Sequence, residues 1–152
     1  MKNTVIFDLD GTLANIDVRR DKSLKSNGKL DWEIFAAPNS IMDWDTPNEP
    51  VIKMAQMFAK EGFKIVIFSG RNDRGFVATK HWLSGNNVPH DLLVMRPDKF
   101  KANSWPIAKG NPATDEMRFM PDEILKKAML DTFVDADDVF LVVDDRDKVV
   151  KM

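Results

Sequence analysis

The chain has no cysteine and only two histidines among its 152 residues. Without cysteine there can be no disulfide, no thiolate metal site and no cysteine nucleophile. No apolar run approaches the length that spans a membrane, and the first residues do not resemble a secretory signal, so the expected location is cytoplasmic. The net charge of −2 lacks the basic excess of proteins that coat nucleic acid, although it is compatible with a contact confined to one strand end.

The length and the 43% hydrophobic content are sufficient for one α/β domain with a core, and the chain is too short for two domains of ordinary size. We therefore treat residues 1–152 as a single domain. Apolar periodicity predicts strands and helices in alternation: strands at 4–7, 64–68, 91–95 and 139–143, and helices at 50–60, 73–83 and 122–133. This order predicts a Rossmann-like, doubly wound parallel sheet, and such sheets bind ligands beyond the carboxyl ends of their strands.

Two polar stretches, 15–48 and 96–118, are longer than ordinary connections. The first contains a candidate short helix at 31–35. Both leave from sheet ends where ligands bind, so we expect small flaps that shape substrate access and not a full cap domain. Trp32 and Trp105 lie in these flaps, where an aromatic ring could stack on a nucleic-acid base.

The most informative motif, residues 8–14 (DLDGTLA), follows directly on the first predicted strand. If the strand continues through Asp10, the side-chain period of two places both carboxylates on one face, and Gly11 lets the chain turn away. A calcium loop would need glycine at its sixth position and glutamate at its twelfth, where this chain has Leu13 and Arg19. The motif therefore favours phosphoryl transfer, in which one carboxylate attacks and its neighbour handles the proton.

Polar residues also follow two other predicted strands. Ser69, Gly70 and Arg71 come after the second strand, and Asp144 and Asp145 come after the last. An arginine at such a strand end is well placed to bind a phosphate with two hydrogen bonds. The carboxyl ends of parallel strands lie at one edge of the sheet, so these groups should meet the first motif there.

The helix predicted at 122–133 supplies a candidate cation. Its apolar residues define one face, and at about 100° per residue Lys126 borders that face while Lys127 points nearly opposite. Lys126 is therefore the better candidate for a role at the site, and Lys127 for a solvated surface position.

These four motifs, in this order, resemble those of the haloacid dehalogenase superfamily, most of whose members are magnesium-dependent aspartyl phosphotransferases. The resemblance implies that Asp8 attacks phosphorus and forms an aspartyl-phosphate. Asp10 would then act as the general acid and base. Lys126 would offset the negative charge around the aspartyl group.

The resemblance also implies sites for metal and substrate. Mg²⁺ would be bound by Asp8, by the main-chain carbonyl of Asp10, and by Asp144 or Asp145, with the choice between the last two left open. Substrate contacts are assigned to the side chains and backbone of the remaining motif residues: Thr12, Arg19, Ser69, Gly70 and Arg71.

Within the superfamily, the chain resembles the 3′-phosphatase domain of bacteriophage polynucleotide kinase-phosphatases. The features that point to this branch are Arg19, eleven residues after Asp8, the S-G-R at 69–71, and the D-D-R at 144–146 followed by a V-V segment. The bacteriophage domains continue through a further helix and strand past the position of Met152. No G-x-x-x-x-G-K-[ST] loop is present, so we expect neither an ATP site nor 5′ kinase activity.

The leading hypothesis is a Mg²⁺-dependent phosphomonoesterase that removes 3′-phosphate from a DNA or RNA end. One alternative is a nucleotidase or another small-molecule phosphatase of the same superfamily. A second is a non-catalytic binding domain, which is less favoured because such a descendant would be expected to lose catalytic groups that are all present here. The sequence leaves open DNA against RNA, the oligomeric state and the biological pathway.

Overall fold

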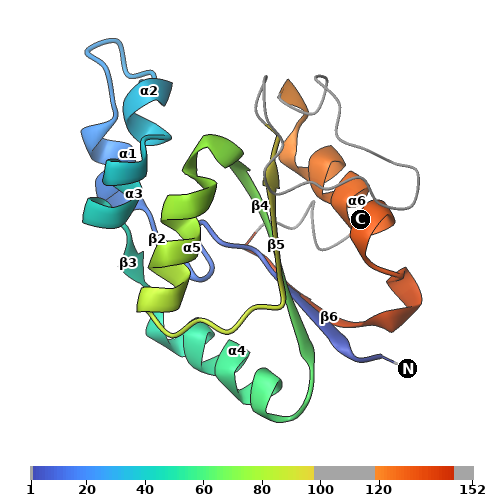
Figure 1. The fold of residues 1–152 in the computed structure, drawn as a ribbon. Helices are drawn as coiled ribbons and strands as arrows, with labels where there is room; N and C mark the ends of the chain where they lie inside the picture. Colours follow the sequence, from blue (N-terminus) through green and yellow to red (C-terminus); the bar gives the residue numbers. More distant parts are fainter. Residues whose placement is uncertain (1, 98–118, 146–152) are drawn as a thin grey trace.

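The computed structural model describes residues 2–97 and 119–145. Within these residues the chain forms a four-stranded parallel sheet at the centre of the molecule (Figure 1). The strands lie in the order β5 (Leu92–Arg96), β4 (Lys64–Asn72), β1 (Thr4–Phe7) and β6 (Val139–Val143). The α/β fold with a parallel sheet is confirmed.

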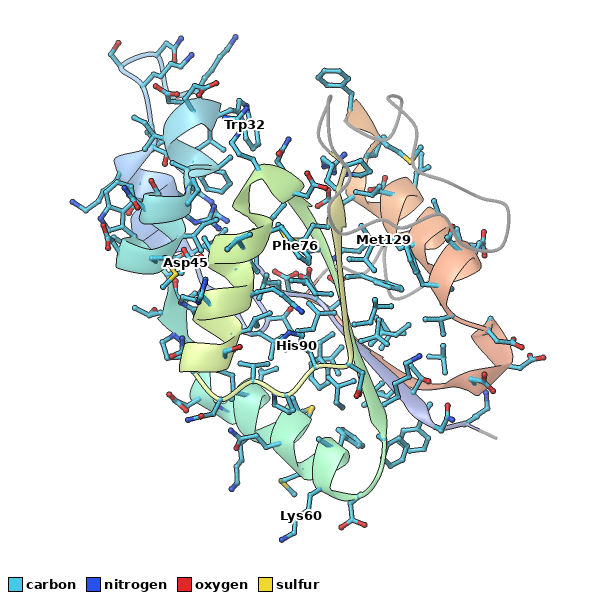
Figure 2. The ribbon with its side chains drawn as sticks, in the orientation of Figure 1. Trp32, Asp45, Lys60, Phe76, His90 and Met129 are labelled. Atoms are coloured by element: carbon cyan, nitrogen blue, oxygen red, sulfur yellow. The ribbon has the colours of Figure 1, made fainter. Side chains whose placement is uncertain are left out.

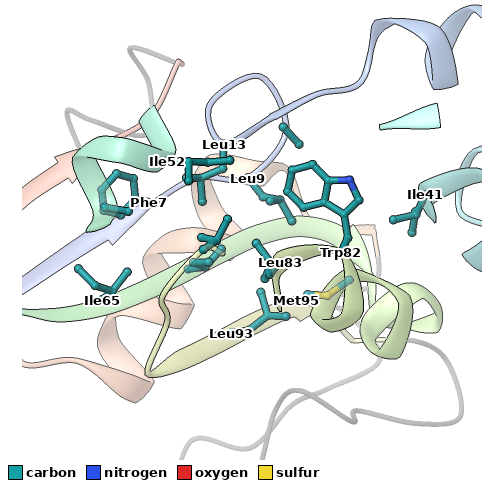
Figure 3. Packing of buried hydrophobic residues seen from close by; sticks show 14 of the residues in the cluster. Phe7, Leu9, Leu13, Ile41, Ile52, Ile65, Trp82, Leu83, Leu93 and Met95 are labelled. Carbon is teal, nitrogen blue, oxygen red and sulfur yellow. The ribbon is translucent and has the colours of Figure 1, made fainter. Parts of the chain in front are cut away.

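Helices cover both faces of this sheet because successive side chains of the strands point to opposite sides. Val5 and Phe7 pack with α4 (Glu49–Lys60) and α5 (Phe76–Gly85), whereas Ile6 packs with α6 (Asp122–Phe133). Figure 3 shows the first of these clusters. None of the helices in the described ranges is long and apolar enough to cross a membrane.

Two strand boundaries differ from the prediction. The strand predicted to end at Phe68 continues to Asn72, so Ser69 to Arg71 are part of β4 and do not follow it. The first strand does not continue through Asp10 as considered above but ends at Phe7. The two differences have different causes. β4 is longer because Asn72 still pairs with Arg96 of β5, whereas the chain after β1 leaves the sheet and turns at Gly11.

The stretch 15–48 is more structured than the polar flap that we expected. It forms a compact insertion of short elements: β2 (Ala14–Asn15), α1 (Asp17–Lys22), α2 (Trp32–Phe35), α3 (Pro38–Trp44) and β3 (Thr46–Pro47). β2 and β3 pair antiparallel where the insertion leaves and rejoins the chain. Ile41 is 1% exposed and belongs to the core cluster, which attaches the insertion to the α5 side of the sheet. Most of the second predicted flap, 98–118, lies outside the described residues.

Candidate active site

The ends of β1 and β6 bring the first and last motifs together. The backbone N–H of Asp8 donates to the carbonyl oxygen of Val143 at 2.9 Å. The chain then turns at Gly11, whose φ of +80° is readily adopted only by glycine. A Cβ atom at Gly11 would collide with the carboxylate of Asp145. The positive φ therefore favours glycine at this position, and the missing side chain leaves room for the carboxylate of Asp145.

Lys126 lies between two of the predicted carboxylates. Its Nζ is 2.6 Å from Oδ1 of Asp8 and 2.8 Å from Oδ2 of Asp144. Lys126 is 2% exposed, although it belongs to a residue type that is almost never buried without a partner. Lys127 instead pairs with Asp131 on the exposed face of α6. The structure thus gives the two lysines the orientations that periodicity predicts.

Burial shifts the protonation of this cluster. It raises the pKa of Asp8 to about 7, against the opposing effect of Lys126, and Asp144 raises it further. Burial alone would lower the pKa of Lys126, but the two carboxylates outweigh this effect and raise it. Lys126 is therefore held as a cation, and its single charge does not balance the carboxylates around it.

The carboxylates form a group with the geometry of a cation site. Asp8, Asp144 and Asp145 each offer one oxygen, and these oxygens all lie within 4.8 Å of one another. Hard divalent cations such as Mg²⁺ prefer oxygen ligands of this kind and retain several waters, for which the exposed position of Asp145 leaves room. The donor set and its excess negative charge therefore fit a divalent cation, and both aspartates of the final pair are within reach of it.

Asp10 belongs to a separate network of charges. Nε of Arg71 donates to Oδ1 of Asp10 at 2.7 Å, and Nη2 of Arg19 lies 3.4 Å from the same oxygen. Both arginines also bind the fully buried carboxylate of Asp45, with distances of 2.8 Å from Arg19 and 2.7 Å from Arg71. Asp45 therefore fixes the two guanidinium groups that face Asp10.

This network sets the protonation state of Asp10. Burial would raise the pKa of Asp10, but the charges of Arg71 and Arg19 outweigh burial, so the pKa lies below its usual range. The ionised carboxylate is the form that accepts a proton. The two guanidinium groups therefore favour the ionised form of Asp10.

The S-G-R segment lines the site from β4. Ser69 is 1% exposed, and its hydroxyl accepts the backbone N–H of Arg71 at 3.1 Å. A Cβ at Gly70 would lie 2.5 Å from Oδ1 of Asp122, so the start of α6 packs directly against this strand. Arg96 joins the two elements, since its guanidinium donates to the carbonyl oxygen of Gly70 at 2.9 Å and to Asp122.

Three residues of the site were not singled out by the sequence. Arg96 is the last residue of β5, and its position at a strand end was the signal that could have indicated it. Asp122 lies in the first turn of α6, one turn before Lys126, and its place at a helix start gave no signal of a contact with β4. Asp45 has no such signal, because it lies inside an insertion that no periodicity links to the sheet.

The remaining predicted residues, Thr12 and Arg19, are also buried. Thr12 is 4% exposed, and its hydroxyl lies 3.4 Å from Oδ2 of Asp8. Arg19 is 1% exposed and donates to the carbonyl oxygen of Phe35 in addition to its acidic partners. Direct substrate contacts by Thr12 and Arg19 stay predictions. Trp105, Arg146 and the V-V segment lie outside the described residues.

The two networks open onto one cavity of about 760 Å³. Its lining combines carboxylates, arginines and aromatic side chains, among them Asp8, Asp10, Arg71, Arg74, Trp32 and Phe119. This volume lies in the range of pockets that bind small organic ligands, about 300–1,000 Å³.

Comparison with known proteins gives a consistent result. The sequence model of one family, described as the polynucleotide kinase PNKP phosphatase domain, matches residues 2–152. Among solved structures, a chain of the Pnkp1/Rnl/Hen1 complex is 25% identical and superposes with a TM-score of 0.67, covering 98% of the present chain and 41% of that chain. A chain of the Pnkp1/Rnl/Hen1 RNA repair complex is 26% identical, with a TM-score of 0.66 and coverage of 97% and 37%. The present chain thus spans about two fifths of the length of these two solved chains.

Proposed function

The chain belongs to the family of PNKP phosphatase domains and is a phosphatase of the haloacid dehalogenase superfamily, and on this premise we propose that it is a Mg²⁺-dependent 3′-phosphatase of polynucleotide ends. The observation that carries the proposal is the position of Asp8. This buried carboxylate lies against Lys126, belongs to the acidic group that fits a cation, and lines the cavity.

The chemistry follows from the two networks. A carboxylate oxygen of Asp8 attacks the phosphorus atom, the bond from phosphorus to the 3′ oxygen breaks, and the leaving oxygen takes a proton from Asp10. Because the arginines favour ionised Asp10, this step needs prior proton uptake by that carboxyl group. In the second half, Asp10 accepts a proton from water, which attacks the aspartyl-phosphate and releases inorganic phosphate.

Charge compensation accompanies both steps. Lys126 offsets the negative charge at Asp8 in both steps. Arg71 lies beside Asp10, and from this position its guanidinium would bind an oxygen of the phosphoryl group. A Mg²⁺ ion held by Asp8, Asp144 and Asp145 would supply the additional positive charge that a phosphate dianion needs beside three carboxylates.

The choice of a polynucleotide end is supported by the family match and by the similarity to chains of an RNA repair complex. It is also supported by the cavity, which has arginines and exposed aromatic side chains in addition to the reacting groups. A phosphate ester with a flat organic base and a charged backbone matches that lining.

Phosphate release from matched oligonucleotides tests the proposal. We expect the protein to release phosphate from a 3′-phosphorylated oligonucleotide much faster than from a 5′-phosphorylated one. This release should require Mg²⁺ and should be absent in Asp8→Asn. If 3′- or 5′-mononucleotides were preferred, the proposed reaction would stand, but the protein would be a nucleotidase. Absence of phosphate release from all four substrates would overturn the proposal.

A further inference from the structure

We propose that Trp32 forms a stacking position for a nucleobase of the substrate, beside the site where phosphate is removed. The inference rests on the proposed function, since it concerns the alcohol side of the same phosphate ester. It adds a recognition element that is separate from the reacting carboxylates.

Trp32 has a large apolar side chain that remains mostly exposed to solvent. Its exposed fraction is 66%, although it is the first residue of a helix whose other apolar side chains are more covered. It lies on the side of the insertion that faces α5 (Figure 2), and it lines the same cavity as Asp8 and Asp10. Trp32 therefore combines high exposure with a place in the lining of a pocket, and aromatic side chains are common in pockets that bind organic ligands.

The ring of Trp32 packs against Phe35. The two rings form a T-shaped contact with 5.5 Å between their centroids, and Arg19 lies over the ring of Phe35 at 4.3 Å. Arg19 in turn contacts Asp10. A continuous chain of contacts therefore connects the indole to the catalytic network and leaves much of the indole accessible.

The helix that carries Trp32 also contacts the turn that follows β4. Asp31 caps α2 by accepting the backbone N–H of Glu33 at 3.0 Å. The carboxylate of Glu33 pairs with Arg74, in the turn Asp73–Gly75 directly after β4, at 3.2 Å. This exposed pair places α2 beside the end of the strand that supplies Arg71.

A second aromatic residue lines the same cavity. Phe119, just before α6, is 82% exposed. A neighbouring hollow of about 680 Å³ shares Gly11 and Asp145 with the cavity, but the described residues that line it include no aromatic side chain. Of the two hollows, the one with Trp32 and Phe119 therefore suits a base, since every nucleobase presents a flat face that stacks on an aromatic ring.

Binding to the inactive Asp8→Asn protein tests the inference without depending on turnover. Two 3′-phosphorylated oligonucleotides are compared by fluorescence anisotropy, one with an ordinary terminal nucleotide and one whose terminal residue lacks its base. We expect the base to strengthen binding about tenfold, within the range measured for stacking of one base on an aromatic side chain. Adding Trp32→Ala should abolish that difference, and adding Trp32→Phe should retain most of it.

Met57→Ala is the matched control, because Met57 is 60% exposed on α4 and does not line the cavity. It should leave the effect of the base unchanged. The inference is overturned if the base contributes nothing, or if Trp32→Ala weakens both oligonucleotides equally. Failure of the proposed function is a different result, namely no release of 3′-phosphate by the wild-type protein, and it can occur whichever way the binding experiment ends.

Discussion

Lys126 Nζ lies 2.6 Å from Oδ1 of Asp8, and this contact joins two residues that are 118 positions apart in the sequence. Lys127, the next residue of α6, forms a separate, solvent-exposed ion pair with Asp131. The two lysines are adjacent in sequence and about 100° apart around α6. They therefore provide a matched comparison between a buried cation beside Asp8, the proposed nucleophile, and an exposed cation.

Lys126→Ala should lower kcat/KM by about 10²–10³-fold, the range found when one stabilising charge or donor is removed from an active site. Lys127→Ala should retain activity close to that of the wild type, because an exposed pair contributes little. Steady-state kinetics on a 3′-phosphorylated oligonucleotide measures both variants. The reverse ranking would mean that the contact between Lys126 and Asp8 is not used in the reaction.

Asp45→Asn should impair activity and stability together. Removing its charge leaves Arg19 and Arg71 without their shared buried partner, and such losses cost about 3–5 kcal/mol of unfolding free energy. The arginines would no longer be held against Asp10, and a small misplacement of this kind can cost about 10²-fold in rate. Denaturant unfolding and kinetics check the two effects.

Asp43→Asn provides the control for Asp45, since Asp43 is exposed in the last turn of α3, two residues before Asp45. It should change neither stability nor rate. Full activity in a folded Asp45→Asn protein would contradict the positioning role of Asp45.

Arg19→Ala separates two roles for this arginine. The sequence resemblance favours a substrate contact, which predicts a larger loss on oligonucleotides than on a small phosphate ester. The described contacts of Arg19 are with Asp10, Asp45 and Phe35, and they predict similar losses on both substrates because Asp10 serves both. Comparison of kcat/KM for an oligonucleotide and for glycerol phosphate decides between them, and a loss confined to the oligonucleotide would favour direct substrate contact.

The sequence predicted those parts of the fold that depend on local pattern. Apolar runs identified the core strands, and the rotation of α6 identified Lys126, because both follow from the periodicity of a single element. Asp45 could not be found in this way, since its partners come from α1 and β4 and are brought to it only by tertiary packing. The continuation of β4 through Arg71 was missed for a related reason: it depends on pairing with β5, which local apolar pattern does not report.

Removal of one carboxylate should reveal the metal site directly. With Mg²⁺ at about 100 times its Kd, a protein that binds the ion only when folded gains about 2.7 kcal/mol of stability. Asp145→Asn removes an oxygen of the Asp8, Asp144 and Asp145 group without touching Lys126, and it should weaken binding about 10–100-fold or more, since even outer-shell partners of metals contribute that much. Thermal melting with and without Mg²⁺ measures the gain in stability.

Asp137→Asn is the control, because Asp137 is exposed and lies before β6. This variant should retain the full stabilisation by Mg²⁺. If Asp145→Asn were stabilised by Mg²⁺ as much as the wild type, Asp145 would be excluded as a ligand.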